Sequence, residues 1–135
     1  MIKLSFDNLS ALNLSYSPSS PLNIEGDLVI QIESRTFLKE PSISIVEFSK
    51  SLRSWLDSFK CGVNETFTYV SVEADEVTIL QFSRCGDNLW YLYSEWQEFK
   101  CDCTLKQLDL LKSVQDFLEL LEKSISVEFG LDILA

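Results

Sequence analysis

Apolar and polar residues alternate at the start of the chain, over residues 2–7. This period of two is typical of a β-strand with one buried face. The same period continues over residues 12–16 after a polar break, so one long kinked strand and two short strands are both open interpretations. Two prolines within residues 17–21 indicate a loop, because each proline removes a backbone donor and restricts its neighbour. Alternation returns over residues 27–33 and predicts a second strand, antiparallel to the first.

Two later stretches show the three- and four-residue spacing of amphipathic helices. The first covers residues 44–59 and opens with Ser44-Ile45-Val46-Glu47, the pattern of a capping box in which the serine oxygen accepts from the Glu47 amide. The second runs to about Lys123 and opens with a similar pattern, Thr104-Leu105-Lys106-Gln107. Residues 125–129 alternate again, which favours a short final strand.

The stretch between the helices, residues 66–101, is rich in β-branched and aromatic residues and indicates a sheet. With residues 73–76 as a four-residue hairpin loop, the predicted cross-strand pairs are Val72 with Val77, Val70 with Ile79, Tyr69 with Leu80 and Phe67 with Phe82. Residues 89–93 supply the next strand. Both faces of these strands carry apolar side chains, so either a helix covers each face or one face is left for a partner.

Taken together, the elements predict an α+β fold in a single domain over residues 1–135. We expect a mostly antiparallel sheet of about five strands, with two main amphipathic helices packed on it. Hydrophobic residues make up 46% of the 135 residues, which is enough for one well-developed core.

Charge is unevenly distributed along the chain, which carries a net −10. Residues 1–67 contain six basic and eight acidic side chains, whereas residues 68–135 contain five and thirteen. Such a surface repels phosphate backbones and anionic membranes, and it attracts a basic protein. The sequence therefore predicts a basic protein partner, with neither nucleic acid nor a membrane bound.

Several chemistries have no sequence signature in this chain. Histidine is absent, which removes Ser-His-Asp and Cys-His activation and the commonest general base near neutral pH. The four cysteines, Cys61, Cys85, Cys101 and Cys103, do not form the paired knuckles of a structural zinc site. We therefore predict no catalytic residues, no metal and no cofactor.

The amino terminus shows no basic stretch that leads into a long apolar run, as a secretory signal would. Apolar runs elsewhere are far shorter than the ~20 residues that span a bilayer. We therefore expect a cytoplasmic protein whose cysteines are mostly reduced thiols.

Paired carboxylates, namely Glu95 with Glu98 and Glu73 with Glu76, raise the possibility of glycoside hydrolysis. Acidic residues are abundant in this chain, and these pairs fall at strand ends and turns, where solvated charge is ordinary. No neighbouring feature marks one of them for a raised pKa. We interpret them as surface charge.

Aromatic and acidic residues are interleaved in the segment 90–99. We expect Trp90 and Trp96 in the core, whereas tyrosines flanked by carboxylates match the aromatic anchors and charged surround of protein interfaces. Basic residues among the aromatics would have favoured single-stranded nucleic acid, but the charge here has the opposite sign. The predicted partner-binding residues are Glu73, Asp75, Glu76, Asp87, Tyr91, Tyr93, Glu95, Glu98 and Asp102.

In size, acidity and single-domain character, the chain resembles the small immunity proteins of bacterial toxin–immunity systems, including those of contact-dependent inhibition. The segment Ser94-Glu95-Trp96-Gln97, after a strand that contains Trp90, also resembles a segment of uncharacterised bacterial α+β proteins of this size. The resemblance implies a non-enzymatic protein that binds and neutralises its cognate toxin, often a basic nuclease. The alternatives are a structural or assembly subunit that acts as a homo-oligomer, and a small-molecule enzyme that uses carboxylates.

Overall fold

The computed structural model describes residues 2–11, 24–63, 65–70, 77–102 and 105–130. Their order is β1 (Ile2–Ala11), β2 (Ile24–Ile32), β3 (Arg35–Ser44), α1 (Ile45–Lys60), β4 (Phe67–Val70), β5 (Thr78–Gly86), β6 (Leu89–Tyr93), β7 (Leu105–Lys106) and α2 (Gln107–Phe129). The strands form two antiparallel sheets, a first sheet in the order β1-β2-β3 and a second sheet in the order β4-β5-β6-β7. The α+β prediction is confirmed, with the strands divided between two sheets.

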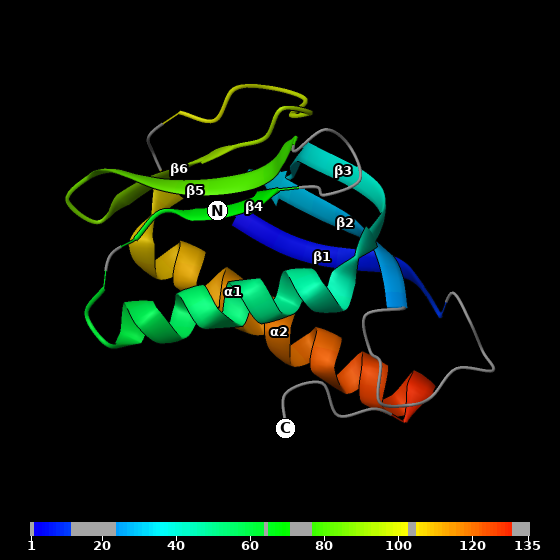
Figure 1. Cartoon of the computed structure of the whole chain (residues 1–135). Helices are drawn as coiled ribbons and strands as arrows, with labels where there is room; N and C mark the ends of the chain where they lie inside the picture. Colours follow the sequence, from blue (N-terminus) through cyan, green and yellow to red (C-terminus); the bar gives the residue numbers. More distant parts are fainter. Residues whose placement is uncertain (1, 12–23, 64, 71–76, 103–104, 131–135) are drawn as a thin grey trace.

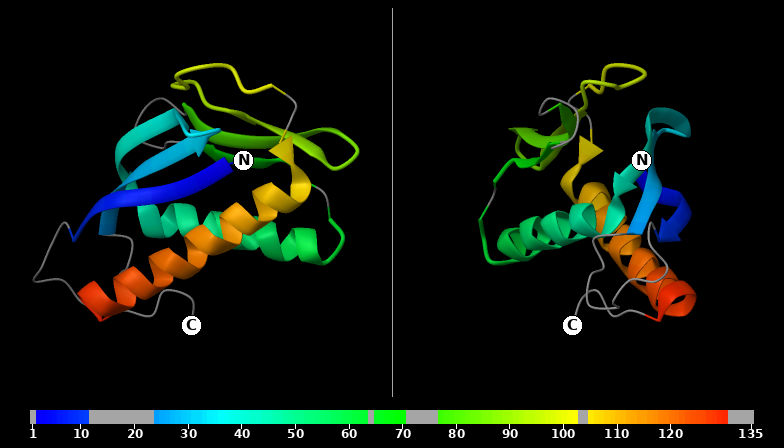
Figure 2. Two further views of the ribbon diagram at one scale, coloured as in Figure 1. Left: turned by 180° about the vertical axis from the view of Figure 1, so that it is seen from behind. Right: turned by 45° about the vertical axis from the view of Figure 1, so that its right-hand side comes forward.

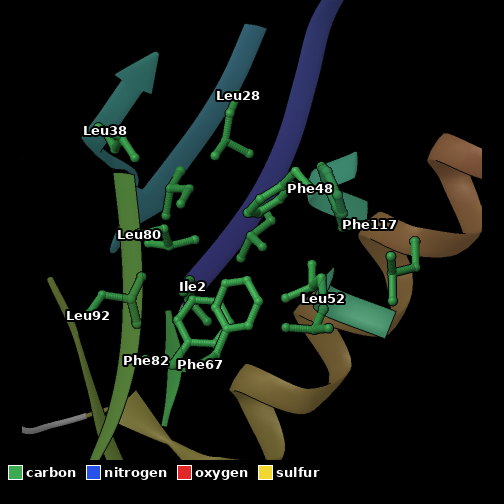
Figure 3. Close-up of a cluster of buried hydrophobic side chains, with 14 of the residues drawn as sticks. Ile2, Leu28, Leu38, Phe48, Leu52, Phe67, Leu80, Phe82, Leu92 and Phe117 are labelled. Atoms are coloured by element: carbon green, nitrogen blue, oxygen red, sulfur yellow. The ribbon is translucent and has the colours of Figure 1, made fainter. Parts of the chain in front are cut away.

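The two helices form one layer, and both sheets lie over it (Figures 1 and 2). Figure 3 shows the core at the junction of these elements, where side chains from β1, β2, β5 and both helices converge. Phe48 of α1 contacts Phe67 of β4 and Phe117 of α2 edge-on, with ring centroids 6.1 and 5.8 Å apart. Each fully buried side chain of this size contributes about 1.5–3 kcal/mol. One shared core therefore holds both sheets and both helices together.

The first sheet contains the predicted antiparallel pair of strands, together with a third strand, β3, that the sequence did not predict. The turn between β2 and β3 is a two-residue turn at Glu33 and Ser34, whose φ angles are 51° and 66°. Hairpins of this kind need positive φ at both central residues, which glycine and asparagine adopt most readily. The turn has neither residue, so the usual sequence signal for a hairpin is missing here.

Asp27 of β2 ties the three strands of the first sheet together where their registers shift. Its carboxylate accepts hydrogen bonds from the side-chain amide of Asn8 at 2.8 Å and from the backbone N–H of Ser42 at 3.1 Å. The bond from Asn8 and then the bond from Ser42 lower the pKa of Asp27 below its usual value. Asn8 and Ser42 both have positive φ, so Asp27 fixes two unusual backbone positions at once.

Both helices form, but neither begins with the predicted capping box. Ser44 precedes α1 without a capping hydrogen bond from its side chain. α2 begins at Gln107, because residues 105–106 pair with β6 as β7. The side-chain oxygen of Gln107 accepts a hydrogen bond from the indole of Trp90 at 3.1 Å. The expected cap at Thr104 lies outside the described residues.

α2 also continues past the predicted end at about Lys123 and reaches Phe129. The predicted short strand over residues 125–129 is therefore wrong. Leu121 and Ile125 are both fully buried and four residues apart, so the apolar stripe of the helix extends through this segment. Gly130, with a φ of 67°, ends the helix in the left-handed conformation.

In the second sheet, the predicted pairs Phe67–Phe82 and Tyr69–Leu80 are confirmed. A register shift follows Tyr69, and Val70 pairs with Thr78 instead of the predicted Ile79. The pair between residues 72 and 77, like the alternation over residues 12–16, involves positions outside the described residues.

The open edges of the first sheet are covered in two ways. α2 lies alongside β1 (Figure 2, left), and the Ser113 hydroxyl accepts a hydrogen bond from the Leu4 N–H at 3.1 Å. On the opposite edge, the Phe37 carbonyl of β3 accepts a hydrogen bond from the Glu98 N–H at 2.8 Å. Covering an edge in this way prevents unplanned strand pairing.

Candidate protein-binding surface

The segment that follows β6, residues 94–102, reaches across to the first sheet. It passes beside the end of β3 (Figure 1), where the backbone bond from Glu98 to Phe37 fixes it. The Phe99 ring packs edge-on against Phe37 at 5.6 Å, and the Arg35 guanidinium lies over Phe99, 4.1 Å from the ring centroid. The segment is thus attached to both sheets.

A turn at residues 94–97 is held by reciprocal hydrogen bonds. The Gln97 N–H donates to the Ser94 carbonyl at 3.3 Å, and the Ser94 N–H donates to the Gln97 side-chain oxygen at 3.1 Å. The Ser94 hydroxyl, itself buried, accepts from the Trp96 N–H at 3.1 Å. Side chains therefore satisfy the backbone of the turn and fix its shape.

Glu95 fastens this turn to the beginning of β5. Its N–H donates to the Thr78 carbonyl at 3.1 Å, and its carboxylate accepts from the Thr78 N–H at 2.5 Å. The residue remains exposed on its other side. Glu95 thus has a structural role that the sequence did not reveal, since a hydrogen bond to a distant strand leaves no local pattern.

Exposed aromatic side chains flank the turn. Trp96 is 40% exposed and Tyr93 is 39% exposed, whereas Trp90 is fully buried. The expectation for Trp90 is confirmed, and the expectation of a core position for Trp96 is wrong, because the turn at Ser94 ends the alternation of β6. Tyr91 is half-buried on the face of the second sheet that also carries Ser83 and Tyr93.

The predicted acidic residues do not all lie together. Asp87 sits in the β5–β6 turn, at the opposite end of β6, about 15 Å of strand away from Glu95. It forms an ion pair with Arg84 at 3.9 Å, and because both side chains are exposed the pair contributes little to stability. Glu98 and Asp102 are exposed in the 94–102 segment. Glu73, Asp75 and Glu76 lie outside the described residues.

Negative charge is less concentrated here than the sequence suggested. Residues 84–106 contain four carboxylates and three basic side chains, whereas residues 107–129 contain five carboxylates and two lysines. Among the described residues, no lysine or arginine lies within ion-pairing distance of Glu98 or Asp102. This surface therefore has two carboxylates without an ion pair among the described residues, Glu98 and Asp102, together with the exposed rings of Tyr93 and Trp96.

The cysteines differ from one another in state. Cys61 and Cys101 are free thiols, and Cys85 is disulfide-bonded, which departs from the expectation of mostly reduced thiols. The Cys101 sulfur accepts a hydrogen bond from the Leu92 N–H at 3.4 Å, and burial raises its pKa. Within the described ranges, no three cysteine, aspartate or glutamate side chains converge to hold a metal ion.

Two grooves lie elsewhere on the molecule. One, of about 680 Å³, runs between β1 and α2 and includes Phe6 and Leu120; the other, of about 500 Å³, lies between α1 and β4. Neither contains any of the predicted partner-binding residues. The candidate surface therefore consists of exposed side chains at a turn, apart from these two grooves.

These features define an α+β protein in which two antiparallel sheets pack on a pair of helices and a rigid turn carries exposed aromatic rings. The chain belongs to the family described as a domain of unknown function (DUF7878), which matches residues 2–127. No curated protein and no solved structure matches the chain. Neither described helix combines the length and the apolar character needed to cross a membrane.

Proposed function

We propose that this protein is a non-enzymatic binding protein of the bacterial cytoplasm that neutralises a basic protein partner. The partner in this proposal is the nuclease-like toxin of a toxin–immunity pair, of the contact-dependent inhibition type. The observation that carries the proposal is the hydrogen-bonded 94–97 turn, in which Glu95 and Trp96 are exposed and next to which, along the chain, Tyr93 and Glu98 are exposed as well.

Two physical arguments support this proposal. Tyrosine and tryptophan are the residues that contribute most often to binding hot spots, and a turn that is already rigid loses little conformational entropy on binding. The carboxylates of Glu98 and Asp102 have no ion pair among the described residues, so a cationic partner can pair with them. The net charge of −10 would also speed the encounter with such a partner.

A homo-oligomeric assembly role is the second candidate. It is favoured by the exposed apolar side chains of α2, since Leu108 and Val127 are 79% and 77% exposed. Light scattering separates the two candidates, because a concentration-dependent dimer that binds no basic protein supports assembly instead. Catalysis by Glu95 is disfavoured, because its carboxylate is already hydrogen-bonded to the backbone of β5.

The test is a pull-down of the product of the neighbouring gene, followed by affinity measurements across a range of salt concentrations. We expect a complex that weakens as salt rises and that weakens further in the double variant Glu98→Gln/Asp102→Asn. The matched control, Glu47→Gln/Asp57→Asn, neutralises two exposed carboxylates on α1. Equal affinity of both double variants would contradict the proposed electrostatic surface.

A further inference from the structure

The three tryptophans of this protein are in different situations. The indole N–H of Trp55 donates to the Glu65 carbonyl at 2.8 Å, and that of Trp90 donates to Gln107. Both rings are buried in the core. Trp96 is the exception: among the described residues its indole has no hydrogen-bond partner, and the ring is 40% exposed. Much of the surface of the Trp96 ring therefore stays accessible to solvent in the folded protein.

The exposure of Trp96 does not come from a loose backbone. Its own N–H is bonded to Ser94, the turn is bonded to β5 through Glu95, and the next residues are bonded to β3 through Glu98. The backbone that carries the ring is therefore already ordered before any partner arrives, and binding has to order only the side chain. This is the condition under which an exposed aromatic side chain binds without a large entropic cost.

The same segment already holds one guanidinium on an aromatic ring. Arg35 lies 4.1 Å from the centroid of Phe99, on the side that faces β3. Trp96 precedes Phe99 by three residues and remains exposed. Tryptophan is the strongest aromatic partner for a cation, so the exposed ring is better suited to this contact than Phe99.

We propose that Trp96 and Tyr93 form the seat for an arginine side chain of the protein partner. The α-carbons of the two residues are three positions apart, so they lie within about 11 Å of each other. A guanidinium stacked on the Trp96 indole can donate to the neighbouring carboxylate of Glu98. Arginine fits better than lysine, because its planar fork stacks on the ring and also pairs with a carboxylate.

This inference rests on the proposed function and adds that an arginine of the partner makes the contact with Trp96. It is tested on the full chain with three soluble nonapeptides: nona-arginine, nona-lysine and an uncharged nona-citrulline peptide. Because Trp55 and Trp90 are buried and out of reach of a soluble peptide, a change in tryptophan emission on binding is assigned to Trp96. We expect nona-arginine to change the emission and to bind at least about threefold more tightly than nona-lysine, with citrulline inactive.

Calorimetric titration measures peptide binding by the variants, because Trp96→Leu removes the fluorescent reporter. Trp96→Leu and Tyr93→Leu should reduce nona-arginine binding to the level of nona-lysine. Val127→Ala, which shortens a more exposed apolar side chain on α2, should leave it unchanged. Equal binding of the two cationic peptides, no binding of either, or an unaffected Trp96→Leu variant would overturn the arginine seat. The pull-down with the basic partner tests the proposed function separately. If wild type and Trp96→Leu bind the captured partner with equal affinity, the proposed function holds and the arginine contact at Trp96 does not.

Discussion

The core face of the second sheet (the inner side) and the turn that follows β6 (the outer side) use their aromatic residues in opposite ways. Trp90 points inward, fully buried, with its ring 5.7 Å from Trp55 of α1 and its N–H bonded to Gln107 of α2. Trp96, six residues later, is 40% exposed on a turn in which every backbone N–H is hydrogen-bonded. The inner side thus uses an aromatic ring to join elements, and the outer side holds a ring ready for contact. Trp90 is held in place as part of the core, whereas the backbone of Trp96 is held in place where the ring can contact a partner.

The inner side should show the largest effect on stability. We expect Trp90→Ala to lower the free energy of unfolding by about 3–5 kcal/mol, because it leaves a cavity beside Trp55 and Phe59 and removes the bond to Gln107. Urea unfolding followed by circular dichroism measures the loss. A change below about 1 kcal/mol would mean that the two sides do not differ as described.

The outer side should show the largest effect on partner binding. Trp96 is 40% exposed, so Trp96→Ala is expected to lower the free energy of unfolding by about 1–2 kcal/mol, less than Trp90→Ala. The same change should weaken the complex with the basic partner by about 2 kcal/mol, or roughly thirtyfold, as expected of a hot-spot residue. Calorimetric titration beside urea unfolding checks both values. A loss of stability as large as that of Trp90→Ala would place Trp96 in the core instead.

Two buried serines, Ser113 and Ser94, sharpen the same comparison, because each hydroxyl accepts one backbone hydrogen bond. Ser113→Ala leaves the Leu4 N–H at the β1 edge unsatisfied and should cost about 1–3 kcal/mol of stability with no effect on partner binding. Ser94→Ala releases the Trp96 N–H and should cost a similar or smaller amount while also weakening the complex. Unfolding and binding measured on both variants separate the two effects. Equal loss of binding in both would show that only global stability matters.

The sequence predicted what depends on local periodicity and missed what depends on distant hydrogen bonds. The α1 stripe and the Phe67–Phe82 and Tyr69–Leu80 pairs follow directly from the hydrophobic pattern. β3 was missed because its turn has two positive φ angles without glycine or asparagine. α2 was predicted too short because the alternation of residues 125–129 also fits a helical stripe that starts further back.

The candidate surface was less predictable still. Aromatic residues at 90 and 96 have the same character in the sequence, and only the Ser94–Gln97 turn decides which is exposed. That turn depends on hydrogen bonds between side chains and backbone, for which the sequence has no strong signal. The anchors of the segment on β3, Phe37 and Arg35, belong to the strand that was missed, so its attachment could not be anticipated.

The smallest expected effect on stability concerns the carboxylates of Asp27 and Glu98. Asp27 is bonded within the fold, as Trp90 is, whereas Glu98 is exposed, as Trp96 is. Asp27 accepts two internal hydrogen bonds, from Asn8 and Ser42, and its lowered pKa means that the folded state favours the ionised form. Its contribution is complete above the unfolded pKa of about 3.9 and is lost as the pH falls through the lower folded pKa. Asp27→Asn should therefore lower stability slightly at neutral pH and flatten the decline in stability below about pH 5.

Glu98→Gln is the matched control for this pH dependence, because Glu98 is exposed and its side chain has no hydrogen bond or ion pair among the described residues. Its stability should follow the wild-type curve within about 0.5 kcal/mol while partner binding declines. Urea unfolding at a series of pH values measures both variants. If Asp27→Asn instead follows the wild-type curve down to pH 3, the carboxylate of Asp27 does not hold the strands of the first sheet together. The contrast between internally bonded and unpaired carboxylates would then lose its structural basis.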